Sequence, residues 1–177
     1  MSAAPFITEP IADDDPTRGF CCGVPALDDF FARHALPNDR RGLGKTFVLR
    51  AQSGEPAILG FYTLSMADLE IADLPDRVKR GLPQYPVPVA RIGRLATDER
   101  VRGTGHGEDL LYDALGRIDA AADSIGCFGV LVDAKGERAA AFYAKYGFAA
   151  LDDQHWPRPH VLVDQGPEAR PGRPVTG

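Results

Sequence analysis

The stretch Val101–Leu111, V-R-G-T-G-H-G-E-D-L-L, places three alternating glycines after an arginine and ahead of an apolar helical pattern. Gly103, Gly105 and Gly107 allow the backbone to come close to another group, because no Cβ stands in the way. Backbone N–H groups at the start of a helix attract anions, and the helix dipole adds to that attraction. The stretch therefore predicts a phosphate site where a strand passes into a long helix.

Two other phosphate-binding motifs do not fit this chain. The dinucleotide fingerprint G-x-G-x-x-G lies in the first strand–helix turn of its fold, whereas this G-x-G-x-G follows several expected strands. The stretch Gly42–Thr46 (G-L-G-K-T) has Asp39 where a P-loop has its first glycine, and a strand pattern follows it instead of a helix. The remaining pattern is R-x-x-G-x-G, formed by Arg102, Gly105 and Gly107. On these residues alone, a structural turn without a ligand is the alternative.

The composition is that of one globular domain of 177 residues, with 44% hydrophobic and 25% charged residues. No apolar run is long enough to span a membrane, and no secretion signal opens the chain, so the cytoplasm is the expected location. Three cysteines, two of them adjacent, argue against a disulfide framework. His155 and His160 lack a partner spacing for a metal, so no metal is expected. The net charge of -5 disfavours indiscriminate nucleic-acid binding but leaves room for a local basic patch.

The hydrophobic periodicity predicts strands first and then a strand–helix–strand–helix–strand run. Strands are expected at Phe6–Ile11, Thr46–Ala51, Ala57–Met66, Val89–Thr97, Phe128–Val132, Phe148–Leu151 and His160–Val163. Helices are expected at Leu27–Ala35, Asp76–Arg80, from Gly107 to Ala121, and at Glu137–Tyr146. This order is typical of a mixed α/β sheet, an α+β arrangement. We expect one domain over residues 1–164 and a flexible tail rich in proline and glycine over 165–177.

A second motif, Ala139–Phe148 (A-A-A-F-Y-A-K-Y-G-F), follows the glycine-rich stretch by some thirty residues. With R-x-x-G-x-G and then A-x-x-F-Y-x-x-x-G-F, the sequence resembles the GNAT superfamily of acetyl-CoA-dependent N-acetyltransferases. The resemblance implies a central, mostly antiparallel sheet with a splayed strand pair, flanked by helices. It also implies acetyl-CoA as the co-substrate.

Further stretches resemble the GNAT toxins of bacterial type II toxin–antitoxin systems. They are Phe20–Phe31, Gly60–Ser65, Tyr85–Asp98 and Val132–Lys135. The resemblance implies a toxin that acetylates the free α-amine of aminoacyl-tRNA and blocks translation. A ribbon-helix-helix antitoxin is the implied partner, and the oligomeric state stays open, with a homodimer as one alternative.

The resemblance places the pyrophosphate of the coenzyme on the glycine-rich turn, beside the charge of Arg102, and the pantetheine along the preceding strand. The residues so implied are Leu95, Ala96, Thr97, Arg102, Gly103, Thr104, Gly105, His106, Gly107 and Phe142. Strict alternation would put Ile92, Arg94 and Ala96 on one face, so we expect a β-bulge near Gly93 that frees N–H donors for the thioester carbonyl. A plain strand with a packing glycine is the alternative.

By the same resemblance, Tyr143 protonates the departing coenzyme thiolate. A phenol pKa of ~10 against roughly 8.5 for a thiol makes this transfer modestly uphill. A purely structural aromatic is the alternative for Tyr143, because Phe142 or Tyr146 could equally face inward. No general base is evident. Gly136 stands where many family members carry an asparagine that contacts the pantetheine, so that contact is not expected here.

Transfer RNA would need basic side chains for its phosphates. The candidates form two clusters and a pair near the expected active cleft: Arg40, Arg41 and Lys45; Arg77, Lys79 and Arg80; Arg91 and Arg94. A solvated surface is the alternative for each group. Two other functions stay open: acetylation of a small amine or protein N-terminus, and coenzyme A binding by an interaction module without turnover. Arginines near a cleft favour tRNA over a cationic amine.

Overall fold

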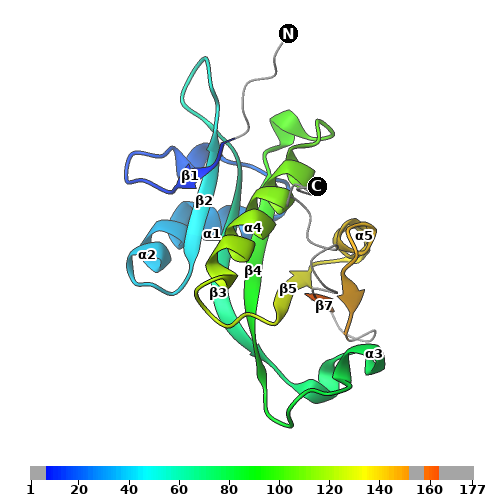
Figure 1. Cartoon of the computed structure of the whole chain (residues 1–177). Coiled ribbons are helices and arrows are strands. Elements are labelled where there is room, and N and C mark those ends of the chain that lie inside the picture. Colours follow the sequence, from blue (N-terminus) through cyan, green and yellow to red (C-terminus); the bar gives the residue numbers. More distant parts are fainter. Residues whose placement is uncertain (1–6, 152–157, 164–177) are drawn as a thin grey trace, which may run out of the picture. The chain divides into compact units, whose positions relative to one another are not determined.

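The computed structural model describes residues 7–151 and 158–163 (Figure 1). Within them, seven strands form one sheet in the order β1-β2-β3-β4-β5-β7-β6. The strands are β1 Glu9–Pro10, β2 Lys45–Arg50, β3 Ile58–Leu69, β4 Val87–Thr97, β5 Gly129–Ala134, β6 Ala149–Ala150 and β7 Arg158–Val163. The β4–β5 pair is parallel, and the β1–β2, β2–β3, β5–β7 and β6–β7 pairs are antiparallel. The expected mixed α/β fold is confirmed. The expected tail 165–177 lies outside the described residues, and the boundary at 164 stays a prediction.

The helices follow the expected order. They are α1 Pro25–Arg33, α2 Ala35–Arg40, α3 Asp76–Lys79, α4 His106–Ala122 and α5 Glu137–Lys145, with short 3-10 helices η1 Thr17–Gly19, η2 Ile71–Asp73 and η3 Glu99–Val101. Gly147, at a φ of 90°, follows the end of α5 as expected. In the part of the chain that the structure describes, no helix is long and apolar enough to cross a membrane.

One helix expectation is wrong. The single helix expected over Leu27–Ala35 is broken, because α1 ends at Arg33 and α2 begins at Ala35. Pro37 explains the break: its ring would clash with the carbonyl four residues earlier in a continuous helix, and it has no N–H to donate. As the third residue of α2, Pro37 needs no such donor. The break leaves His34 exposed, although the periodicity placed it on the apolar face, while Ala35 is fully buried.

The first of two compact units comprises the described residues up to Ser65 together with Arg94–Ala114. Its core is aromatic. The rings of Phe31 and Phe61 stack with centroids 4.3 Å apart, and Phe20 meets Phe31 edge-on at 5.0 Å. In this unit α2 packs beside β2 (Figure 1). The start of α4 belongs to it, so the glycine-rich stretch is attached to a rigid core.

The second unit comprises Met66–Gly93 and the described residues from Leu115 onward. Here β5 pairs with β4 on one side and β7 on the other, and α5 packs on β5. The parallel pairing with β4 covers Val89–Ile92 and ends at the residue before Gly93. That end point agrees with a change of strand geometry near Gly93, and the β-bulge itself stays a prediction.

Candidate active site

The glycine turn, which we define as Arg102–Gly107, joins η3 to α4. Gly103 and Gly105 have φ angles of 78° and 89°, in the left-handed region that favours glycine. An ideal Cβ at either position would have no atom within 4 Å. Their Cα atoms therefore face open space, which a side chain would fill and a ligand can use.

The backbone N–H groups of Gly103, Gly105 and Gly107 donate no hydrogen bond to any residue that the structure describes. The intervening Thr104 is satisfied within the turn, because its N–H and its hydroxyl both donate to the carbonyl of Val101, at 3.3 Å and 2.5 Å. Its hydroxyl also lies 2.8 Å from Nδ1 of His106. Three free donors at the start of a 17-residue helix can hold an anion such as a diphosphate.

A buried carboxylate, Asp98, fixes the chain just ahead of this turn. It is 2% exposed and accepts hydrogen bonds from Arg100 Nε at 2.7 Å, Arg100 N at 3.0 Å and Cys21 N at 3.1 Å. Burial raises the pKa of Asp98, but these hydrogen bonds outweigh it and hold the pKa at about 2. Asp98 is therefore ionised at neutral pH and caps η3. No local pattern in the sequence points to Asp98 beyond its place in the stretch Tyr85–Asp98.

The guanidinium of Arg102 is partly engaged by its own chain. Its Nη2 donates to the carbonyl of Cys22 at 3.1 Å and lies 3.5 Å from Oε1 of Glu99. About half of each charged side chain is exposed, 51% for both Arg102 and Glu99. The charge expected beside a phosphate is thus present, but an adjacent carboxylate offsets part of it.

The end of β4 carries the three strand residues implied in coenzyme binding. Ala96 is buried in the aromatic core of the first unit, and Leu95 and Thr97 are half-buried. An ideal Cβ on Gly60 would lie 3.2 Å from the carbonyl oxygen of Ala96 and 2.7 Å from Cδ1 of Leu110. Gly60 therefore allows β3 to approach β4 and α4 closely. In the sequence Gly60 begins the stretch Gly60–Ser65, and no local pattern indicates this role.

Arg94 shares its strand with these residues and has a packing contact. Its guanidinium carbon lies 3.6 Å from the centroid of the Phe30 ring, a cation–π distance. This contact explains how a charged residue can alternate with buried ones on β4. The structure thus places Arg94 on the aromatic core of α1.

Tyr143 belongs to the second unit and is 7% exposed. Its ring meets Phe142 and Phe148 edge-on, at 5.2 Å and 5.5 Å. Its hydroxyl forms no hydrogen bond with the described residues. Burial, and then the negative charge of Asp133, raise the pKa of Tyr143 to about 12. Of the three aromatics on this helix end, Phe142 and Tyr146 are half-buried, so Tyr143 is the inward one.

The backbone conformation at position 136 favours glycine over the asparagine that many family members carry there. Gly136 precedes α5 with φ 98° and ψ 166°, a conformation that is essentially restricted to glycine. An asparagine at this position would be strained. The departure from the family pattern is therefore built into the backbone that starts α5.

The eight basic residues expected to contact tRNA differ in how far they are neutralised. Ion pairs join Arg40 to Asp13, Lys45 to Asp39, Lys79 to Asp76 and Arg91 to Asp133. Arg94 lies on Phe30, and three arginines remain exposed, with side chains that form no ion pair or hydrogen bond with the described residues: Arg41, Arg77 and Arg80. Five of the eight basic side chains thus form an ion pair or a cation–π contact, and the other three form neither with the described residues.

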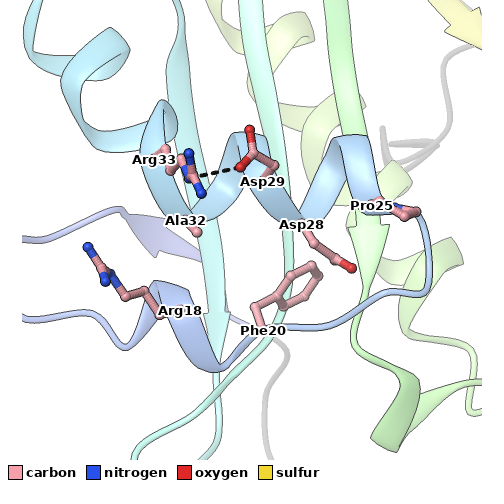
Figure 2. Close-up of a pocket in the computed structure, with 7 residues that line it drawn as sticks. All are labelled: Arg18, Phe20, Pro25, Asp28, Asp29, Ala32 and Arg33. Carbon is pink, nitrogen blue, oxygen red and sulfur yellow. Dashed lines mark ion pairs between the residues drawn. The ribbon is translucent and has the colours of Figure 1, made fainter.

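A hollow of about 720 Å³ lies on α1 in the first unit (Figure 2). It is lined by Arg18, Phe20, Pro25, Asp28, Asp29, Ala32 and Arg33. Arg33 and Asp29 form an ion pair at 2.9 Å on its rim. No residue expected to bind coenzyme or tRNA lines the hollow. Over the same described residues, no group of three or more His, Cys, Asp or Glu side chains is placed to hold a metal ion.

The sequence model of the acetyltransferase (GNAT) family matches residues 12–148. A tRNA-acetylating toxin of Mycobacterium tuberculosis (strain ATCC 25618 / H37Rv) is 42% identical over 138 residues, which cover 78% of this chain and 81% of the relative. The probable toxin TacT of Sinorhizobium fredii (strain NBRC 101917 / NGR234) is 36% identical over 161 residues, covering 84% of this chain and 87% of the relative.

Solved structures of toxins are similar to this chain as well. AtaT complexed with acetyl-methionyl-tRNAfMet superposes with a TM-score of 0.81 at 28% identity, covering 90% of this chain and 95% of that one. A tyrosine-to-phenylalanine mutant of AtaT, bound to the C-terminus of the antitoxin AtaR and acetyl-CoA, gives a TM-score of 0.74 at 26% identity. That superposition covers 89% of this chain and 92% of that one. Both similarities extend over nearly the whole of each chain.

Proposed function

The chain belongs to the acetyltransferase (GNAT) family, and on that premise we propose that it transfers acetyl from acetyl-CoA to the free α-amine of aminoacyl-tRNA. The observation that carries the donor half is the set of three glycine N–H groups at the start of α4 that have no hydrogen-bond partner among the described residues. The acceptor half is supported by the 42% identical relative, a tRNA-acetylating toxin. Acetylation of the amine would block translation with that tRNA.

The glycine turn would hold the pyrophosphate on the N–H groups of Gly103, Gly105 and Gly107. These donors and the dipole of α4 favour negative charge, and the open space at Gly103 and Gly105 lets it reach the backbone. Arg102, Thr104 and His106 complete the turn. The pantetheine would lie along Leu95, Ala96 and Thr97, with Phe142 as a further coenzyme contact.

Tyr143 would act on the departing thiolate. With the pKa of Tyr143 at about 12 and that of a thiol at roughly 8.5, full proton transfer is uphill by roughly 5 kcal/mol. The hydroxyl therefore acts mainly by donating a hydrogen bond to the sulfur as negative charge develops on it. A buried hydroxyl without a protein partner among the described residues is suited to that task, because it is free to bind a reacting atom.

The amine must be neutral to attack. The described side chains offer no evident general base, and an aminoacyl ester, whose amine is more acidic than an ordinary amine, can lose its proton to water. We propose that the free charges of Arg41, Arg77 and Arg80 contact tRNA phosphates. None of these three side chains forms an ion pair with a described residue, so each can release a counterion from the nucleic acid.

An antitoxin is the proposed partner, as AtaR is for AtaT. We assign it to the ribbon-helix-helix class from the sequence resemblance. The proposed site of action is the cytoplasm, where charged tRNA is found. A homodimer is compatible with this function and is tested by the mass of the purified protein in solution.

The deciding experiment incubates the protein with acetyl-CoA and a pool of charged tRNAs and identifies acetylated amino acids by mass spectrometry. Uncharged tRNA is the matched control, because it offers the same phosphates without the amine. Acetylated aminoacyl-tRNA is the expected product. Turnover only with polyamines or peptide N-termini would refute this proposal and favour the alternative, acetylation of a small amine or protein N-terminus. Coenzyme binding without any product would indicate an interaction module.

A further inference from the structure

Residues 21–23, which precede α1 and its N-cap Val24, are hydrogen-bonded to the chain that leads into the glycine turn. The backbone N–H of Cys21 donates to Asp98 at 3.1 Å, and the N–H of Glu99 donates back to the carbonyl of Cys21 at 2.8 Å. The Nη2 of Arg102 then donates to the carbonyl of Cys22 at 3.1 Å. Three hydrogen bonds therefore connect segments that are 77 to 80 residues apart in sequence.

Gly23 allows the last of these contacts to form. It has a φ of 86°, and an ideal Cβ there would lie 2.8 Å from Oε1 of Glu99 and 3.1 Å from Nη2 of Arg102. Any larger residue would push this ion pair away from the backbone and would also strain its own conformation. The glycine, the carboxylate and the guanidinium thus form one packed unit, which we call the Arg102 brace (Gly23, Glu99 and Arg102).

Arg102, the last residue of the brace, directly precedes Gly103, whose N–H is the first of the three glycine donors. A hydrogen bond from a guanidinium to a carbonyl at this point restrains the start of a turn whose own backbone bonds are few. Glu99 holds the guanidinium in place and offsets its charge, which leaves the anion to the glycine N–H groups. The hydrogen bond to the Cys22 carbonyl and the ion pair with Glu99 both restrain the backbone at Arg102.

We propose that Arg102 is a positioning residue: with Glu99 and Gly23, it fixes the glycine turn in the geometry that binds the coenzyme pyrophosphate. This proposal rests on the proposed function, because it takes the turn as the pyrophosphate site. It differs from the simpler role of Arg102 as a direct phosphate ligand. The two roles predict opposite effects of removing the charge of Glu99.

The test compares Glu99→Gln, Arg102→Ala, the double variant and Gly23→Ala with the wild-type protein. Arg33→Ala is the matched control, because it breaks an exposed ion pair on α1, with Asp29, outside the brace. Calorimetry measures the Kd of coenzyme A, and steady-state kinetics separate KM for acetyl-CoA from kcat. Thermal unfolding checks that each variant is folded, and hydrogen exchange follows the hydrogen-bonded N–H groups of Arg102 and Thr104 without ligand.

The brace predicts that Glu99→Gln and Arg102→Ala each weaken coenzyme A binding by roughly threefold to tenfold. The double variant should be no worse than Arg102→Ala, because the two residues act as one unit. KM for acetyl-CoA should rise more than kcat falls, and exchange of the N–H groups of Arg102 and Thr104 should quicken, because these two donate within the turn to the carbonyls of Glu99 and Val101. Gly23→Ala should weaken binding although it leaves both charged residues in place, and Arg33→Ala should not change the Kd.

An unchanged or tighter Kd in Glu99→Gln, with weaker binding in Arg102→Ala, would overturn the brace and make Arg102 a direct ligand. The same Glu99→Gln result with an unchanged Arg102→Ala would also overturn the brace. Should a variant unfold, unchanged exchange at the N–H groups of Arg102 and Thr104 in the remaining folded variants would decide against the brace. Failure of the wild-type protein to bind coenzyme A would instead refute the proposed function, and this proposal with it.

Discussion

Replacing Tyr143 with phenylalanine separates a catalytic hydroxyl from a structural one, because the two roles move stability in opposite directions. The ring is 7% exposed and packs against Phe142 and Phe148, and phenylalanine keeps those contacts. The hydroxyl has no hydrogen-bond partner among the described residues. Tyr143→Phe therefore removes a buried polar group and leaves no other buried group of the described protein unpaired.

The magnitudes follow from this environment. A buried hydroxyl without a partner costs about 1–3 kcal/mol of folding free energy, so the variant should be as stable as the wild type or slightly more stable. A hydrogen bond to a charged atom contributes about 1.5–3 kcal/mol, which corresponds to a fall in kcat of about 10-fold to 150-fold. Denaturant unfolding measures the first quantity, and acetylation of charged tRNA measures the second.

The pH dependence adds a check. Burial raises the pKa of Tyr143 from 10.0 to about 12, so the hydroxyl stays protonated throughout the ordinary assay range. The ratio of wild-type to variant kcat should therefore be constant up to about pH 10. Since the folded pKa is the higher one, ionisation of Tyr143 does not affect the free energy of unfolding below pH 10, and that free energy falls as the pH rises from 10 through about 12.

Tyr146→Phe is the matched control, because this half-buried tyrosine lies next to the same helix end. Its kcat should stay within about twofold of the wild type. A Tyr143→Phe protein with wild-type kcat would refute the catalytic role. Destabilisation by more than about 1 kcal/mol would show that the hydroxyl has a structural partner.

Three further predictions test the glycine turn, the buried carboxylate Asp98 ahead of it, and the proposed contacts with tRNA. Gly105→Ala should weaken coenzyme A binding at least tenfold by calorimetry, because a residue with a Cβ is strained at a φ of 89° and its side chain would fill the proposed anion site. Gly116→Ala is the control: Gly116 lies on an exposed face of α4, and its substitution should leave binding unchanged. Asp98→Asn should lower the free energy of unfolding at pH 7 by roughly 2 kcal/mol. Since the folded pKa of Asp98 is depressed to about 2, that deficit should shrink as the pH falls from 4 towards 2, and an equal deficit at pH 2 would contradict the assignment. Arg77→Glu should weaken tRNA binding several-fold and lower its salt dependence, whereas Arg33→Glu should do neither.

Much of the fold could be predicted because its signals are local. The turn-and-helix signal at Gly103–Gly107 and the F-Y-x-x-x-G-F end of α5 depend on residues that are neighbours in sequence. The broken helix was also predictable in principle, since Pro37 is visible in the sequence and forbids a continuous helix there. The periodicity of the apolar residues alone favoured the unbroken helix, and that preference was wrong.

The engagement of the charged residues could not be predicted in this way. Nothing local to Arg91 or Arg40 indicates that Asp133 or Asp13 neutralises it, because these partners are 42 and 27 residues away. The same holds for the hydrogen bond from Arg102 to the carbonyl of Cys22. Clusters of basic residues in a sequence thus overstate the positive charge available to a nucleic acid.

The sequence by itself determined the order of strands and helices, the glycine turn and the family, because periodicity and motif spacing express local backbone geometry. Only the tertiary structure decided which polar groups stay free: the N–H groups of the glycines, the hydroxyl of Tyr143 and the charges of Arg41, Arg77 and Arg80 among the described residues. The physical reason is that a hydrogen bond or an ion pair depends on distance in space. Folding brings distant residues within that distance, and it leaves without a partner the groups that we propose bind substrate.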